Sequence, residues 1–269
     1  MVTENNSGSP TENTSHSKLY SEIDKIFFSD GYNTAEQHLG EGITTDNLIH
    51  MSKTLYDAVD DMIEAFIGRC LKEGKSVACT NGCYLCCCQA VLVLPYEVLY
   101  LDSYIKKQLS KKDQLEIMDQ VIEKDEITKK MKVQEFLHYK APCPILKNGS
   151  CLAYKARPMA CRMFLSSSKD GCIEEYHNPG NVDIFPDLYE FTIRAGRMIN
   201  EGVCSYLVEN QLFPTEWQIE SSLRTVWEGQ DSWQKWLEGE NIFQKRNYSD
   251  AEISYLHNFG KQKSNTKDH

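Results

Sequence analysis

The chain has 269 residues, of which 41% are hydrophobic and 25% are charged, and its formal net charge is −10. This composition is that of an ordinary globular protein, and a chain of this length can bury a core without disulfides or metal ions. The negative charge argues against general nucleic-acid binding, which needs a basic face. The longest apolar run, residues 90–96, is too short to cross a membrane.

The N-terminal residues 1–17 are mainly Asn, Ser, Thr, Glu and Pro, with almost no apolar side chains. They lack the features of a signal or transit peptide, so we expect a disordered tail. Without a span or a leader, the chain is expected to be cytoplasmic, where thiols stay reduced. Residues 18–260 are expected to form one helical domain, which contains a cysteine-cluster region at 79–172, and residues 261–269 are expected to fray.

Apolar residues at intervals of three and four predict a long helix over residues 45–73, with Gly74 as its stop. Its predicted buried stripe is Leu48, Met51, Leu55, Val59, Met62, Phe66 and Cys70, which makes Cys70 a core residue rather than a ligand. A shorter helix is predicted over residues 19–28, followed by a turn at Asp30 and Gly31.

Further along the chain, Pro95 can open a helix over residues 96–109. A solvated helix, continuous or broken, is predicted over 111–139, and another helix falls within 187–211. Short helices with four tryptophans follow. The predicted fold class is therefore mostly α, a single helical domain with a cysteine-rich loop centre and little strand.

Nine of the eleven cysteines lie between residues 79 and 172, in two groups. Spacings of two or three residues allow one turn of backbone to direct two thiolates at one ion. A disulfide scaffold suits short secreted chains, and buried structural cysteines are usually scattered among core positions, so both alternatives fit less well. The two groups are Cys79, Cys83, Cys86, Cys87 and Cys88, and then Cys143, Cys151, Cys161 and Cys172.

The charges around these cysteines favour a metal centre. Residues 75–96 contain no Asp or Glu, and residues 141–163 contain four cations and no carboxylate. A centre held by four thiolates carries a net negative charge, which Arg or Lys stabilises and Asp or Glu destabilises.

The string Cys79-x3-Cys83-x2-Cys86-Cys87, followed by Pro95-Tyr96-Glu97, then Cys143-Pro144-Ile145-Leu146 and Cys151-x2-Tyr154-x2-Arg157-Pro158-x2-Cys161-Arg162, resembles the YkgJ-type cysteine-cluster family. Members of that family are described as zinc- or iron-chelating domains with a C-x-x-C-x-x-C-C signature. Here three residues, rather than two, separate the first two cysteines, and Cys88 extends the run.

The cysteines and the resemblance together predict binding of zinc or an iron–sulfur cluster. The expected metal ligands are Cys79, Cys83, Cys86, Cys87, Cys143, Cys151 and Cys161, with Cys88 and Cys172 as further candidates. Arg157 and Arg162 are expected to lie beside the cofactor, in unequal roles. The two cysteine groups are expected to converge, and Cys88 is expected to face away from the metal, because three consecutive side chains cannot all reach one tetrahedral ion.

An enzymatic alternative also remains open. The spacing Cys79-x3-Cys83-x2-Cys86 matches the three-cysteine loop of radical S-adenosylmethionine enzymes, although the barrel strand that normally precedes that loop is not visible. The family architecture also recurs in enzymes that methylate lysines of flagellin, which implies a protein lysine N-methylase-like activity by analogy. One metal site or two, and any protein partner or substrate, stay undetermined by the sequence; no general nucleic-acid or membrane partner is expected.

Overall fold

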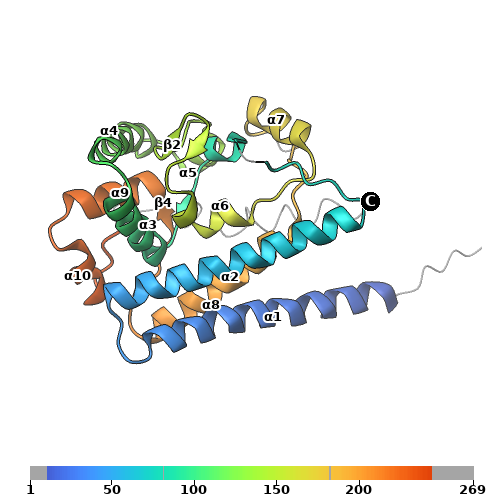
Figure 1. Cartoon of the computed structure of the whole chain (residues 1–269), viewed down its shortest axis with the longest axis horizontal. Helices are drawn as coiled ribbons and strands as arrows, with labels where there is room; N and C mark the ends of the chain where they lie inside the picture. The colour runs from blue at the N-terminus through green and yellow to red at the C-terminus, as the bar shows by residue number, and fades with distance from the viewer. Residues whose placement is uncertain (1–10, 81, 182, 244–269) are drawn as a thin grey trace, which may run out of the picture.

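The computed structural model describes residues 11–80, 82–181 and 183–243, and within these residues the fold is mostly α, as predicted. Three long helices lie side by side and form one layer (Figure 1). These helices are α1 (Thr11–Leu39), α2 (Thr45–Lys72) and α8 (Glu190–Glu209).

Helix α2 confirms the predicted long helix. The side-chain oxygen of Thr44 accepts a hydrogen bond from the backbone N–H of Asn47, which caps the first turn. Helix α2 ends at Lys72, and Gly74 follows with φ +71°, a conformation that glycine adopts without strain. Cys70 is buried, as expected of a core residue.

The predicted turn at Asp30 and Gly31 is wrong, because α1 continues through both residues. Gly31 is needed for packing: a Cβ built on it would lie 2.0 Å from the carbonyl oxygen of Ile199 in α8. Gly202 of α8 is in the reciprocal position, where a Cβ would lie 2.0 Å from the carbonyl oxygen of Phe28. The two glycines therefore let the backbones of α1 and α8 approach closely.

Helix α1 also begins at Thr11, inside the segment 1–17 that we expected to be a disordered tail. Forming the first turn of a helix is unfavourable, but the packed part of α1 already supplies that turn. Each further residue then gains one backbone hydrogen bond, so a polar segment can extend the helix. Residues 1–10 of that predicted tail, residues 244–260 of the predicted domain and the predicted frayed end 261–269 lie outside the described residues.

A second group of helices covers one end of this layer (Figure 1). It consists of α3 (Pro95–Gln108), α4 (Lys111–Thr128), α9 (Ile219–Glu228) and α10 (Ser232–Leu237). The predicted solvated helix over 111–139 is broken, since α4 ends at Thr128 and α5 (Val133–His138) follows.

The cysteine-bearing segments contain short elements rather than one long loop. The 3₁₀ helix η1 (Leu85–Cys88) is followed by β1 (Leu92–Val93), which pairs antiparallel with β4 (Trp217–Gln218). Strands β2 (Leu146–Lys147) and β3 (Ser150–Cys151) form a hairpin closed by Asn148 and Gly149, both with positive φ. Then follow η2 (Tyr154–Ala156), α6 (Met159–Met163) and α7 (Lys169–His177).

All four strands are two residues long and form two separate antiparallel pairs. In the part of the chain that is described, they do not build the parallel βα barrel that a radical S-adenosylmethionine enzyme requires. Among these same residues, no helix is both long and apolar enough to serve as a transmembrane segment.

Candidate metal centre

The two cysteine segments lie side by side, as the sequence predicts. The backbone N–H of Cys143 donates a 2.7 Å hydrogen bond to the carbonyl oxygen of Cys87, and the N–H of Ala141 donates a 3.0 Å bond to the carbonyl oxygen of Cys88. The β2–β3 hairpin then returns the chain, so that Cys151 at its end pairs with Leu146. These contacts bring residues of the first cysteine group next to those of the second.

Backbone N–H groups point at several of the sulfurs. The N–H of Ile145 donates to the sulfur of Cys143, and the N–H of Ala153 donates to that of Cys151. Burial raises the pKa of the Cys143 thiol to about 11, and burial also raises the pKa of Cys151; in each case the N–H group opposes the rise. Such donors stabilise a thiolate and are used in metal centres to orient and tune cysteine ligands.

The thiols of Cys86 and Cys87 shift each other's pKa in opposite directions. The thiol of Cys87 donates a hydrogen bond to the sulfur of Cys86, which lowers the pKa of Cys86 to about 7 and raises the pKa of Cys87. The backbone N–H groups of Cys86 and Cys87 and the guanidinium of Arg157 also favour the Cys86 thiolate. One thiolate is therefore available near neutral pH before any metal binds.

Cys87, Cys143, Cys151 and Cys161 lie near enough for their charges to affect one another's pKa values. Burial, followed by the charges of Cys143, Cys151 and Cys86, raises the pKa of Cys161 well above its ordinary value. The pKa of Cys87 is raised first by its hydrogen bond to Cys86 and then by burial. The charges of Cys86, Cys161 and Cys143 raise it further. Mutual repulsion of this kind is relieved when a cation binds among the thiolates.

Cys79 and Cys172 lie in a second neighbourhood, around Ser166. The N–H of Ser166 donates a 3.3 Å hydrogen bond to the sulfur of Cys79. Burial raises the pKa of Cys79, the Ser166 N–H opposes this, and the charges of Cys86, Cys172 and Cys83 raise it further. Burial also raises the pKa of Cys172, against a hydrogen bond with the Ser166 side chain.

Cys88 differs from the cysteines beside it. It is 2% exposed, whereas Cys86 is exposed and Cys87 is half-buried. Burial raises its pKa, and the nearest charges that oppose this rise belong to Lys124 and Lys140 rather than to the arginines. Cys88 thus faces the core, as expected. All eleven cysteines of the chain are free thiols, so no disulfide framework is present.

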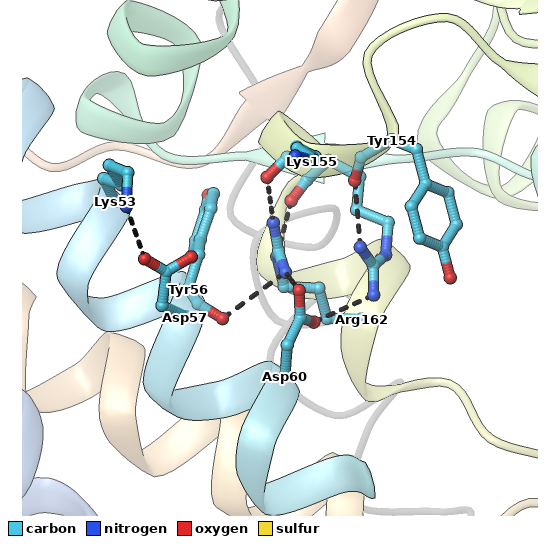
Figure 2. Close-up of polar contacts among 8 residues, drawn as sticks. Lys53, Tyr56, Asp57, Asp60, Tyr154, Lys155 and Arg162 are labelled. Carbon is cyan, nitrogen blue, oxygen red and sulfur yellow. Dashed lines mark hydrogen bonds and ion pairs between the residues drawn. The ribbon is translucent and has the colours of Figure 1, made fainter.

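The two arginines occupy different environments. Arg162 is fully buried in its side chain, stacks 4.1 Å over the Tyr56 ring and forms an ion pair with Asp60 (Figure 2). It also donates to the carbonyl oxygens of Arg157 and Lys155. Protein groups therefore occupy its guanidinium, and its role is to tie α6 and η2 to α2.

Arg157 is the arginine beside the thiols. Its guanidinium bonds Asp60 at 2.9 Å and stacks 3.9 Å over the Tyr154 ring, and its charge lowers the pKa values of Cys86 and Cys151 against the effect of burial on each. Tyr154 is 62% exposed, so Arg157 lies near the surface of the site.

Glu97 belongs to the motif of the resemblance, but the sequence did not indicate its structural role. Its carboxylate accepts hydrogen bonds from the N–H of Leu94 at 2.8 Å, the N–H of Met159 at 2.7 Å and the hydroxyl of Tyr56 at 2.9 Å. It thereby fixes the start of α6, which carries Cys161, to α3 and α2. Pro95 followed by Glu97 is a helix-start signal that could have indicated the contact with Leu94, but not those with Met159 and Tyr56.

Among the described residues, no three Cys, His, Asp or Glu side chains are close enough together to form a ready-made metal site. The chemistry of the donor set nevertheless fits a thiophilic metal: free thiols gathered from three chain segments, N–H groups directed at their sulfurs and a nearby guanidinium.

Comparison with known proteins agrees with this chemistry. Residues 78–181, under half of the chain, match the family model described as "CxxCxxCC: Putative zinc- or iron-chelating domain". The cysteine-cluster resemblance is thereby confirmed for this segment, which is similar to the domain described as zinc- or iron-chelating. No curated protein and no solved structure matches the chain.

Proposed function

We propose that the chain is a cytoplasmic metal-binding protein whose cysteines hold zinc or an iron–sulfur cluster. The observation that carries the proposal is the meeting of the two cysteine groups, where the N–H of Cys143 donates to the carbonyl oxygen of Cys87 at 2.7 Å. In addition, the N–H of Ser166 donates to the sulfur of Cys79 at 3.3 Å. An inert core cysteine needs no such donor, whereas a metal-bound thiolate is stabilised by it.

The proposed ligands are those expected from the sequence: Cys79, Cys83, Cys86, Cys87, Cys143, Cys151 and Cys161, to which the position of Cys172 adds an eighth. Arg157 would offset the negative charge of the bound centre, because it already favours the thiolate forms of Cys86 and Cys151. Arg162 and Glu97 would not contact the metal. Arg162 would hold η2 in place, and Glu97 would hold the start of α6.

The chemistry supplied by the metal depends on which one binds. A closed zinc site would stabilise the fold around it, and an iron–sulfur cluster would add electron transfer. Sulfur-only coordination suits both, and the Cys143–Pro144 dipeptide, familiar from ferredoxin-type loops, favours iron–sulfur. Free thiols in such number support a reducing compartment.

Anaerobic purification followed by an absorption spectrum and by zinc, iron and sulfide analysis tests the proposal. A brown protein with iron, sulfide and a broad band at about 400 nm would identify a cluster, and a colourless protein with bound zinc would identify a zinc site. A protein that contains neither metal, and takes up neither after reduction, would contradict the proposal. The methylase-like alternative gains no support from the matched domain or from the short strands.

A further inference from the structure

A cleft lies where three helices meet, α3, α4 and α9 (Figure 1). Its volume is about 360 Å³, which falls within the range of about 300–1,000 Å³ that is usual for small-molecule sites. None of the described residues that line it is a cysteine. The cleft is therefore separate from the candidate metal centre, and the proposed metal binding gives it no role.

The walls of the cleft are apolar. Ile105 of α3 and Val226 of α9 are buried, and Met118 of α4 and Trp227 of α9 are half-buried. Leu115 lies about one helical turn before Met118 and is 60% exposed, although its side chain is large and aliphatic. An apolar ligand in the cleft would remove this surface from water, which favours binding.

One side of the cleft is held in place by a buried carboxylate. The indole N–H of Trp227 donates to Asp102 at 2.7 Å, and the Nζ of Lys106 donates to the other carboxylate oxygen at 2.9 Å. The indole N–H of Trp233 lies 3.3 Å from that second oxygen. Asp102 is 3% exposed and does not line the cleft, whereas the side chain of Lys106 does and is 55% exposed. Trp227 and Lys106 are thus positioned before any ligand binds, which lowers the entropy cost of binding.

A second cation of the cleft, Lys111, has no acidic partner in the part of the chain that is described. Its Nζ donates a 3.0 Å bond to the side-chain oxygen of Gln114, which also lines the cleft. The amide of Gln114 donates in turn to the carbonyl oxygens of Lys106 and Leu109, so this corner is fixed to both α3 and α4. No Asp or Glu is among the described lining residues. The cleft therefore carries positive charge at its edge, although the whole chain has a net charge of −10.

We infer that this cleft binds a small aliphatic carboxylate, with its chain against the apolar walls and its carboxylate on Lys106 and Lys111. An ammonium group has three donors, and Asp102 and Gln114 take one from each lysine, so both lysines keep donors for a ligand. Hydrogen bonds between charged groups are the stronger kind, which favours an anion over a neutral ligand. The aliphatic chain is favoured because four of the five apolar wall residues are Ile, Leu, Met and Val, and the thioether of Met118 adapts easily to a flexible chain.

The test is calorimetric titration of the full chain with sodium octanoate, well below the concentration at which it forms micelles. Octanoate should bind at one site. Its uncharged counterpart 1-octanol should bind about tenfold more weakly, because it cannot form charge-assisted bonds with the lysines. Lys111→Met should weaken octanoate binding by a similar factor. Lys112→Met removes the next exposed lysine of α4, which does not line the cleft, and should leave the affinity unchanged.

The apolar wall is tested with a second pair of variants on α4. Leu115→Asp should abolish octanoate binding, because it places a carboxylate in the cleft, and it should not unfold the chain because Leu115 is exposed. Ile127→Asp is the matched control, since Ile127 is 42% exposed on the same helix and lies outside the cleft. Circular dichroism verifies that each variant keeps its helices.

Nuclear magnetic resonance of the chain with ¹³C-labelled methionine methyl groups locates the bound octanoate. The Met118 signal should shift on binding, and the signal of Met51, which is buried in the core, should not. Three results would overturn the inference: no binding of octanoate to wild type, equal affinities for octanoate and 1-octanol, or unchanged binding by Leu115→Asp. Binding that leaves the Met118 signal unshifted would also overturn it, because the ligand would then lie elsewhere. None of these outcomes bears on metal binding by the cysteines.

Discussion

The backbone N–H of Cys143 lies 2.7 Å from the carbonyl oxygen of Cys87 and donates a hydrogen bond to it. This bond fixes the distance between two cysteine groups that are separated by α3, α4 and α5. Because it joins backbone to backbone, it does not depend on whether a metal is bound. The metal-free chain therefore already holds ligands of both groups near one another, which reduces the entropy that must be lost when a metal binds.

Cys88→Ser should leave the metal content close to that of wild type, because Cys88 is buried and faces Lys124 and Lys140. Cys151→Ser should lower the metal content sharply, because Cys151 ends strand β3 and its thiolate is favoured by the neighbouring Arg157. Metal analysis of the two purified variants, side by side, measures the difference. Equal loss of metal in both variants would mean that the assignment within the run of three cysteines is wrong.

Arg157→Ala should weaken zinc binding about tenfold, the order expected for loss of a group that supports metal ligands. The guanidinium favours the thiolates of Cys86 and Cys151, and Arg157→Lys should restore part of the affinity because it keeps the charge. Competition with a chromogenic chelator at pH 7 measures the affinity. Arg69→Ala, which removes an exposed ion pair with Glu73, is the matched control and should change nothing.

Arg162→Ala should destabilise the protein by more than about 2 kcal/mol, because it removes a buried guanidinium that pairs with the partly exposed Asp60, and it leaves the carbonyl oxygens of Lys155 and Arg157 without that donor. Lys53→Ala removes an ion pair with Asp57 on the same helix (Figure 2), but both of those side chains are exposed. It should cost less than about 1 kcal/mol. Urea unfolding of both variants compares them; similar losses would show that burial does not distinguish these pairs.

Gly31→Ala and Gly202→Ala should each destabilise the chain by more than about 2 kcal/mol, since the new Cβ would overlap a carbonyl oxygen of the facing helix. Gly68→Ala is the control, because nothing lies within 4 Å of a Cβ there and the residue is inside α2. It should stabilise the helix by about 0.5–1 kcal/mol. Thermal or urea unfolding gives the sign of each change, and a stabilising Gly31→Ala would refute the close approach of α1 and α8.

Glu97 predicts a pH dependence of stability. Burial raises its pKa from 4.5 to about 7 despite three hydrogen bonds. The native state then binds the proton more tightly than the unfolded state does, so this stabilisation is complete below pH 4.5 and is lost as the pH rises through 7. The change amounts to about 3 kcal/mol.

The measurement for Glu97 is urea unfolding of the metal-free chain between pH 4.5 and 8, compared with Glu97→Gln. Gln is neutral throughout, so the stability of wild type relative to the variant should fall as the pH rises across this range. All other titrating groups are the same in the two proteins, so their effects cancel in the difference between the two free energies of unfolding. If that difference did not change with pH, a raised pKa for Glu97 would be contradicted.

The sequence by itself determined the secondary structure wherever a periodic apolar stripe and a local stop coincide. Helix α2 begins beside its Thr44 cap and ends before Gly74, and α3 begins at Pro95. It also determined the kind of chemistry, because the spacing of the cysteines and the lack of carboxylates are local properties of the chain. Local signals of this kind act through hydrogen bonds and side-chain contacts within a few residues.

Only the tertiary structure decided how distant segments are placed. A glycine such as Gly31 can mark the end of a helix, or it can let another helix pack closely, and the neighbouring sequence is the same in both cases. Here the close packing depends on Ile199 of α8, far along the chain. The same holds for Arg157 and Arg162, which share one motif and one partner, Asp60, but differ in role because only Arg162 is buried against Tyr56 of α2. The meeting of the two cysteine groups depends on η1 lying against α7 and against the segment around Cys143, a long-range packing that no spacing along the chain encodes.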